Sequence, residues 1–279
     1  MHQDVLVEAF LHRSGAEGQE CVPGVGSVKT EACEVLTLSM NLTKFALVNI
    51  QTQMTIQEAI QARHSVRQYI DKPLTEDVVA ALKAKIDEVN AEAGLHIQLI
   101  LNEPKSFQCA MAKYGRFSGV KSYLVMAGKK TDDLDEKVGY YGEQIVLLAQ
   151  MLGLNTCWVG VSYGKIPNTY VLEEDEKIAC YISLGYGINQ GVSHKIKSVK
   201  DVSNASDLTP KWFLDGVNAA LLAPTAVNQQ KFFFEYTTGN KVIAKRTVSL
   251  IGYTQMDLGI VKYHFEVGAG KENFEWSVI

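Results

Sequence analysis

The sequence lacks several features that would place it quickly in a class. Its five cysteines are widely separated and include no C-x-x-C pair, so neither a disulfide framework nor a zinc site is predicted. No apolar run reaches the about 18 residues that a membrane-spanning helix requires. Lys and Arg total 27 against 31 Asp and Glu, so the basic surface of a general nucleic-acid binder is also missing. We therefore expect neither a membrane nor a nucleic acid as partner.

Two further absences concern metals and export. The six histidines include no H-x-x-x-H or similar spacing, so no metal site is predicted. The first thirty residues carry Asp4, Glu8, Glu17 and Glu20, where a secretory signal peptide would need an apolar stretch. The sequence thus predicts a reduced, cytoplasmic protein.

Residues 1–53 differ in character from residues 54–279. Gly, Ser and Glu are scattered through Ser14 to Cys33 without a helical or strand period, so we expect an extension with little fixed structure. Met54 stands just before the first regular pattern, which raises the hypothesis that the natural start lies there. Residues 54–279 are expected to form one domain.

Helical periodicity recurs through this domain. Thr55 and Glu58 have the spacing of a capping box, and Gly94 and Gly153 have the character of helix ends. Thr209 and Pro210 suit the N-cap and first residue of another helix. The predicted helices span about residues 55–63, 75–94, 138–153, 209–222 and 256–267.

Strand-like segments lie between these helices without a regular β-α-β alternation. They span residues 95–101, 122–127, 155–159, 178–184, 231–236 and 242–248, followed by a short aromatic strand at the C-terminus. Thr238-Gly239-Asn240 predicts a hairpin turn between the last two long strands. This pattern favours an α+β fold with a mixed or antiparallel sheet flanked by helices over a doubly wound parallel sheet.

The segment Arg63-His64-Ser65-Val66-Arg67 follows directly after the first predicted helix. Arginine offers a planar fork of donors and serine a hydroxyl, which suits them to hold an anion such as phosphate. A solvated helix end with basic residues near the negative end of the helix dipole is the alternative interpretation. The motif alone leaves both open.

Two more segments carry groups that suit a planar ligand. In the segment 223–230, Asn228 and Gln230 each offer a donor and an acceptor, which matches the edge of a heterocycle; a plain polar loop is the alternative. In the segment 153–160, a predicted strand ends in a glycine whose backbone amide a flat ring can approach. Trp158 in that strand is otherwise an ordinary core residue.

Together these segments resemble the nitroreductase-like family of FMN-dependent oxidoreductases, over roughly Thr55 to the C-terminus. The segment from Arg63 is similar to the family's Arg-(His)-Ser-x-Arg clamp. The resemblance implies that Arg63 and Ser65 hold the flavin phosphate and ribityl chain, and that Arg67 lies at the N1/O2 edge of the ring.

The other segments extend this resemblance. Lys195 and Lys197, after the Leu-Gly-Tyr-Gly sequence at residues 184–187, would complete the phosphate cradle, and the Gly160 region is similar to the one whose backbone amide faces flavin N5. Asn228 and Gln230 look like the Asn-x-Gln pair of the family's Ala-Pro-Ser motif. The expected cofactor-binding residues are Arg63, His64, Ser65, Arg67, Trp158, Val159, Gly160, Val161, Lys195, Lys197, Pro224, Thr225, Asn228 and Gln230.

One departure from the family pattern concerns the order of the motifs. Family members carry the Ala-Pro-Ser segment before the long helix, whereas here the segment 223–230 follows the Gly-Tyr-Gly strand, and Lys231-Phe232 replaces the common Pro-Trp. This arrangement is similar to a branch with two degenerate halves fused in one chain, about 54–205 and 206–279. Ordinary members are homodimers that bind flavin at the subunit interface. We therefore expect the two halves of this chain to form an intrachain pseudo-dimer, and the protein to be a monomer or a homodimer.

The resemblance implies transfer of hydride from NAD(P)H through bound FMN to a small nitroaromatic, quinone or enone acceptor. A flavin-binding protein without turnover shares every feature described. Gly160-Val161-Ser162-Tyr163-Gly164 also matches the G-x-S-x-G motif of serine hydrolases, although Pro167 follows where a helix should begin. Gly185-Tyr186-Gly187 is a poor dinucleotide fingerprint, since no helix is predicted after it.

Overall fold

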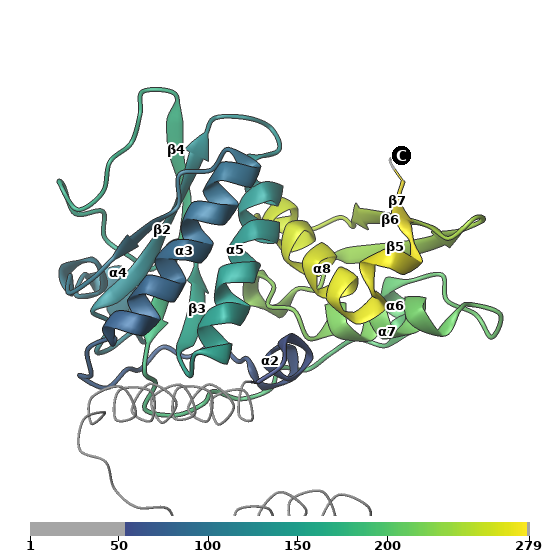
Figure 1. Ribbon diagram of the computed structural model, residues 1–279, viewed down its shortest axis with the longest axis horizontal. Helices are drawn as coiled ribbons and strands as arrows, with labels where there is room; N and C mark the ends of the chain where they lie inside the picture. Colours follow the sequence, from purple (N-terminus) through teal and green to yellow (C-terminus); the bar gives the residue numbers. More distant parts are fainter. Residues whose placement is uncertain (1–53, 278–279) are drawn as a thin grey trace, which may run out of the picture. The chain divides into compact units, whose positions relative to one another are not determined.

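A four-stranded antiparallel sheet forms the centre of the first part of the fold. The computed structural model describes residues 54–277, so the predicted extension at residues 1–53 lies outside the described residues. The strands follow the spatial order β1-β2-β4-β3 (Figure 1). They are β1 (Gln98–Ile100), β2 (Ser122–Lys129), β3 (Asn155–Val159) and β4 (Glu176–Gly185). A bulge between Met126 and Ala127 interrupts the pairing of β2 with β4.

Both faces of this sheet are buried, which the alternation of side chains along β2 makes clear. Leu124 and Met126 belong to the larger hydrophobic cluster on one face. Tyr123, Val125 and Ala127 belong to a second cluster on the other. Because successive strand residues point to opposite faces, a strand that is buried on both sides reads as a continuous apolar run.

Two long helices, α3 (Glu76–Ala93) and α5 (Leu134–Met151), lie across one face of the sheet (Figure 1). In α3 the apolar residues at helical spacing are buried, and Gly94 in the left-handed conformation ends the helix as predicted. A shorter helix, α2 (Ile56–Ala62), begins with the predicted capping box of Thr55 and Glu58. The opposite face of the sheet is covered by residues that include Phe107 and Phe117.

The C-terminal part adds a second, three-stranded sheet and two helices. Helix α8 contacts α5 on one side and the second sheet on the other, so the larger hydrophobic cluster continues through both (Figure 1). The elements are α7 (Lys211–Leu221), β5 (Phe232–Thr237), β6 (Lys241–Arg246), α8 (Thr254–Ala269) and β7 (Glu275–Trp276). Two short helices complete the described fold, α4 (Ala110–Tyr114) and α6 (Val199–Val202).

Helices α5 and α8 approach each other through glycine. A Cβ atom on Gly139 would collide with the backbone oxygen of Met256, and one on Gly259 would collide with the backbone oxygen of Glu136. The two backbones therefore meet directly, which only residues without a side chain permit. This contact fixes the position of the N-terminal end of α8, where the candidate site described below is formed.

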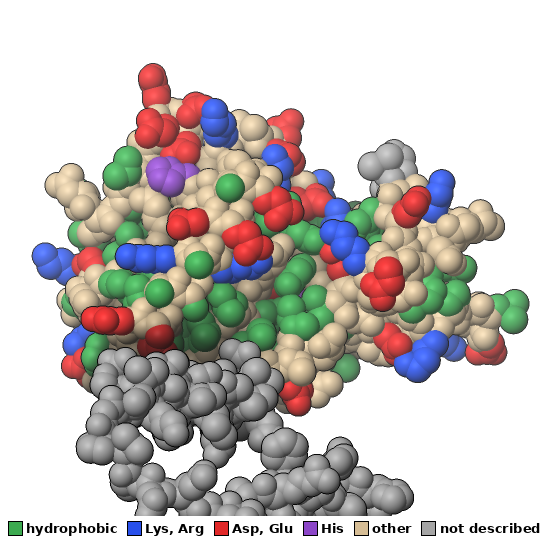
Figure 2. All heavy atoms as spheres, viewed as in Figure 1, with side chains coloured by type: hydrophobic (Ala, Val, Ile, Leu, Met, Phe, Trp, Pro, Cys, Tyr) green, Lys and Arg blue, Asp and Glu red, His purple; other side chains and the backbone are tan. Residues whose placement is uncertain are grey.

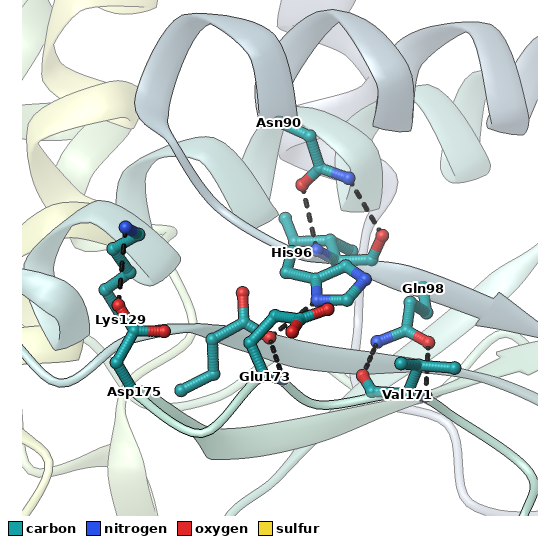
Figure 3. Close-up of polar contacts among 9 residues, drawn as sticks. Asn90, His96, Gln98, Lys129, Val171, Glu173 and Asp175 are labelled. Atoms are coloured by element: carbon teal, nitrogen blue, oxygen red, sulfur yellow. Dashed lines mark hydrogen bonds and ion pairs between the residues drawn. The ribbon is translucent and has the colours of Figure 1, made fainter.

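Side-chain hydrogen bonds fasten the outer strand β1 to its surroundings (Figure 3). The Asn90 side chain exchanges two hydrogen bonds with the backbone of Ile97, which ties α3 to the start of the strand. The Gln98 side chain does the same with Val171, and His96 Nδ1 lies 2.7 Å from Glu176 Oε2. These contacts hold the segment before β4 against the sheet edge.

The α+β architecture with antiparallel pairing and flanking helices confirms the predicted fold class. The predicted long helices and strands are present, with bounds that shift by a few residues. Pro210 is the N-cap of α7 rather than its first residue, so the prediction for Thr209 was wrong by one position. Helices α4 and α6 were not predicted, because each is too short to show a helical period.

The surface of the described residues mixes charges of both signs. On the face shown in Figure 2, acidic and basic side chains are interspersed, and hydrophobic side chains are visible in the middle of the face. Within residues 54–277, no helix is both long enough and apolar enough to cross a lipid bilayer.

Candidate functional site

A cavity of about 670 Å³ lies between the end of β3 and the start of α8, a size within the range of small-molecule and cofactor sites. Residues from both predicted halves of the chain line it. From the first half come Ser65, Arg67, Tyr114, Gly115, Arg116, Phe117, Trp158, Val159, Gly160, Val161, Ser162 and Cys180; from the second come Pro224, Thr225, Ala226, Val227, Ile251, Tyr253, Met256, Asp257 and Ile260.

The segment around Ser65 reaches this cavity because it runs beside β3. Ser65 forms a parallel bridge with Thr156, and the backbone N–H of Val66 donates to the carbonyl of Thr156 over 3.0 Å. The Ser65 and Arg67 side chains therefore stand next to the end of β3. The guanidinium of Arg67 lies 5.9 Å from the centre of the Phe117 ring, in the range of a cation–π contact.

The end of β3 forms one wall of the cavity. The indole N–H of Trp158 donates to Glu143 Oε2 on α5 over 2.9 Å, which fixes the orientation of the tryptophan. Gly160 follows the strand, and a Cβ atom there would lie 2.6 Å from the Tyr253 ring. Glycine at position 160 thus lets Tyr253 lie directly against the backbone.

The loop 224–230 forms the facing wall and has a strained backbone. Val227, Asn228 and Gln230 have φ angles of 46°, 55° and 45°. Positive φ in a β-branched residue is an outlier, and such strain persists only where surrounding contacts impose it. Here Asp257 supplies two of them: Oδ1 accepts from the Ala226 N–H over 2.9 Å, and Oδ2 accepts from Gln229 Nε2 over 2.8 Å.

Asp257 is a buried carboxyl group at the edge of the cavity, with 3% of its surface exposed. Burial raises its pKa to about 6, against the opposing effect of the hydrogen bonds from Ala226 and Gln229. Burial disfavours the charged carboxylate more than two donors stabilise it. The cavity is therefore lined by a carboxyl group whose pKa, at about 6, is well above that of an exposed aspartate.

A group of buried polar residues lies behind Trp158. Glu143 is fully buried, and its Oε1 is 2.9 Å from His264 Nε2 and 3.8 Å from Arg63 Nε. His264 Nδ1 is 3.1 Å from the Ala219 carbonyl, which can only accept, so Nδ1 carries a proton. Arg63 is 3% exposed, and its Nε and Nη1 have no hydrogen-bond partner. Burial lowers the pKa of Arg63, and the Glu143 carboxylate opposes this effect.

The structure brings some of the predicted residues to the cavity and leaves others behind its walls. Ser65, Arg67, Trp158, Val159, Gly160, Val161, Pro224 and Thr225 line it. Arg63 instead faces Glu143, two residues from Ser65. His64 is half-buried, and its pKa is lowered by burial and by the neighbouring Arg63 and His194.

The remaining four predicted residues bind one another. Asn228 Nδ2 and Gln230 Nε2 each donate to the Lys195 carbonyl over 2.8 Å, and Gln230 Oε1 accepts from the Lys197 N–H over 2.9 Å. Lys197 Nζ donates to the Gln230 carbonyl over 2.6 Å. These side chains hold the segment 195–197 against the loop 224–230, and none of the four lines the cavity.

Sequence reasoning missed several residues of the cavity, among them Arg116, Phe117, Tyr253 and Asp257. Arg116 lies just after the short helix α4, where the sequence shows no pattern. Asp257 stands in the first turn of α8, where an acidic residue is explained by the helix dipole alone. Only the tertiary structure shows that these residues line the same cavity.

Ser162 also lines the cavity but lacks the surroundings of a hydrolase nucleophile. The residues after it form turns rather than a helix. Within residues 54–277, no histidine hydrogen-bonds to Ser162: His194 contacts the Leu221 carbonyl, and His264 contacts Glu143 and Ala219. The geometry therefore gives no support to a serine hydrolase.

The sequence and the fold are similar to those of known proteins. Residues 55–269 match the family described as "Putative TM nitroreductase". The chain is similar to the crystal structure of "a putative nitroreductase" from Thermotoga maritima MSB8, with 24% identity, a TM-score of 0.58 and coverage of 79% of this chain and 86% of that one. No curated protein matches the sequence.

Two crystal structures of "a putative nitroreductase in complex with FMN" show weaker similarity. One from Exiguobacterium sibiricum 255-15 shares 14% identity at a TM-score of 0.45, covering 56% of this chain and 99% of that one. One from Desulfovibrio desulfuricans shares 17% identity at a TM-score of 0.44, covering 57% and 100%. The family match spans most of the described chain, and the protein therefore belongs to this nitroreductase family.

Proposed function

We propose that this protein is an FMN-dependent oxidoreductase that binds the flavin in the cavity between β3 and α8, takes hydride from NAD(P)H and passes it to a small acceptor. The observation that carries the proposal is the meeting of Ser65, Arg67 and Gly160 with Pro224 and Thr225 around one cavity. These groups come from three distant segments, each of which resembles part of a flavin site.

The chemistry of the lining fits the ring and ribityl chain of FMN. Val159, Met256 and Ile260 supply apolar surface, and Ser65 and Thr225 supply hydroxyl groups that hydrogen-bond sugar oxygens. The phosphate needs cationic donors. Arg63 faces Glu143 behind the cavity wall and has two buried nitrogen atoms without a hydrogen-bond partner, so it is proposed to supply positive charge to the phosphate cradle from behind this wall. Lys195 and Lys197 remain proposed members of this cradle.

The residues of the cavity would act on the flavin chiefly by charge. When bound, FMN would accept hydride at N5 and donate it to the acceptor. Arg67 has no ion-pair partner among residues 54–277, so its charge is free to stabilise negative charge on the ring. The Gly160 backbone lines the cavity, and the Tyr253 ring packs against it.

The cavity also supports the proposal of an intrachain pseudo-dimer. Residues 54–205 and 206–279 both contribute lining side chains, and α5 of the first half packs against α8 of the second. One chain would then hold a complete flavin site. A second chain is not needed for any lining residue identified here.

The direct test is a titration of the full-length protein with FMN, followed by anaerobic addition of NADH or NADPH. We expect bound flavin that bleaches with the reductant and reoxidises with a quinone or nitroaromatic. Flavin that binds but does not bleach would indicate a binding protein, and no binding of excess FMN would contradict the proposal.

Replacement of Arg67 tests the role of its charge. Arg67→Ala should retain FMN but lower its two-electron reduction potential by about 30–60 mV, because one charge-assisted contact of about 1.5–3 kcal/mol to the reduced ring is lost. Lys121→Ala, at an exposed position with a surface ion pair to Asp71, is the matched control and should leave the potential unchanged. A potential equal to that of the wild type would remove Arg67 from this role.

A further inference from the structure

The mouth of the cavity is ringed by exposed apolar side chains from four separate segments. Tyr114 is 84% exposed, Val161 62%, Val227 76% and Ile251 46%, and all four line the cavity. Exposed apolar groups that gather around one opening mark a binding surface rather than the scattered surface residues of any protein. They suit a ligand with a flat, apolar body.

One cation at this mouth is not used by the proposed flavin site. Arg116 is exposed and lines the cavity. Its side chain makes no hydrogen bond and no ion pair within residues 54–277, whereas the lining carboxyl group, Asp257, is engaged by Ala226 and Gln229. The Arg116 guanidinium is therefore free to pair with an anionic group of a ligand.

The backbone of Arg116 has a left-handed conformation, which glycine adopts more readily than residues with a Cβ atom. Its φ angle is 62°, at the residue that follows the C-cap of α4. The Phe117 N–H donates to the Ala112 carbonyl and the Arg116 N–H to the Lys113 carbonyl, both over 2.9 Å, which closes the helix end. This position favours glycine because a Cβ atom is strained there. Local stability therefore does not favour an arginine at this position.

The neighbouring Gly115 fixes where this turn lies. A Cβ atom on Gly115 would be 2.8 Å from Ser162 Cβ, so the backbone packs closely on the segment after β3. Arg116 is thus held at the mouth beside Val161 and Ser162, the segment that follows Gly160.

We infer that Arg116 determines specificity for electron acceptors that combine a planar apolar body with a negative charge, such as aromatic carboxylates or sulfonates. The apolar ring of the mouth would contact the body and Arg116 the charge. The inference rests on the proposed function for the redox chemistry, but binding of an aromatic anion does not require the flavin.

The first experiment measures binding to the flavin-free protein. We expect 2-naphthoate to bind about three- to tenfold more tightly than 2-naphthamide. Because Trp158 lines the cavity, tryptophan fluorescence can be used to measure binding of both compounds. Arg116→Gly should reduce this preference. Lys113→Ala is the matched control, because Lys113 is an exposed cation on α4, three residues before Arg116, and does not line the cavity. Equal preference in Arg116→Gly and the wild type would overturn the inference.

The second experiment uses the FMN-loaded protein, reduced by light and mixed with 4-nitrobenzoate or 4-nitrobenzamide. The ratio of the two reoxidation rate constants should fall about three- to tenfold in Arg116→Gly and stay unchanged in Lys113→Ala. Comparing ratios removes the difference in intrinsic reactivity between the acceptors. An unchanged ratio together with a raised KM for NADH or NADPH would overturn the inference and assign Arg116 to the nucleotide phosphate.

The stability of the variant separates binding from folding. Arg116→Gly should have a Tm equal to or above that of the wild type, because glycine relieves the positive φ. A Tm well below that of the wild type would contradict the argument from strain. Charge preference in binding without any FMN affinity would refute only the proposed function, whereas FMN turnover without charge preference would refute only the role of Arg116.

Discussion

Asp257 shows how one buried side chain can link the shape of the cavity to pH. Its two oxygens hold Ala226 and Gln229 of the strained loop 224–230, and burial raises its pKa to about 6. The carboxylate is the better acceptor for both N–H groups, yet the buried position favours the neutral acid. Stability and loop geometry therefore depend on the protonation of the same group.

The pH dependence of folding tests this description. A carboxyl group with a higher pKa in the folded protein holds its proton more firmly there than in the unfolded chain between about pH 4 and 6. Its contribution to stability is present below about pH 4 and is lost as pH rises through 6, at a cost of about 3 kcal/mol. Asp257→Asn should remove this loss, seen as a smaller fall in the urea unfolding free energy between pH 4 and 7.

The exposed Asp207 provides the control for this measurement. Asp207→Asn should show the same dependence of unfolding free energy on pH as the wild type. If Asp257→Asn shows it too, Asp257 does not carry the raised pKa.

At the scale of elements, the crossing of α5 and α8 determines whether the cavity forms. Gly139 on α5 and Gly259 on α8 let the two backbones touch, and this contact places the N-terminal end of α8 opposite β3. The sequence predicted both helices from their apolar periodicity. It did not predict the crossing, because glycine within a helix is usually interpreted as a residue that destabilises the helix.

Substitution at this crossing should be costly. Gly139→Ala places a methyl group against the Met256 backbone, which cannot move aside as a flexible side chain would, so we expect a loss of at least about 2 kcal/mol in the free energy of unfolding. Gly252→Ala, where a Cβ atom would meet nothing within 4 Å, should change it by less than about 0.5 kcal/mol. Urea denaturation measures both, and equal stability of the two variants would show that the helices separate at little cost.

At the scale of the whole molecule, the proposed pseudo-dimer makes a prediction about stoichiometry. We expect one FMN per chain in a monomeric protein, measured by flavin absorbance and light scattering after size-exclusion chromatography. FMN at about 100 times its Kd should stabilise the fold by about 2.7 kcal/mol, which raises Tm by roughly 5–10 °C for a domain of this size. AMP, which carries a ribose phosphate and a purine in place of the ribityl phosphate and the flavin ring, serves as control and should give a smaller shift. One FMN per two chains would contradict a complete site in each chain.

Local chemistry determined much of what the sequence revealed. Helices and strands follow from side-chain period and from caps such as Thr55 with Glu58 and Gly94, which act within a few residues. The family motifs could be recognised in the sequence for the same reason, since each occupies one short segment. Ser65, Arg67 and Gly160 could be named from sequence and do line one cavity.

The partners of long and polar side chains were decided only by tertiary structure. Arg63 turns to Glu143 on α5, and Asn228 and Gln230 turn to the backbone near Lys195, although the sequence alone assigns all three to the cofactor. A buried donor or acceptor must find a partner wherever packing provides one, and that partner can lie anywhere along the chain. The sequence therefore determined the elements and the family, whereas the packing of α8 on α5 determined which side chains face the cavity.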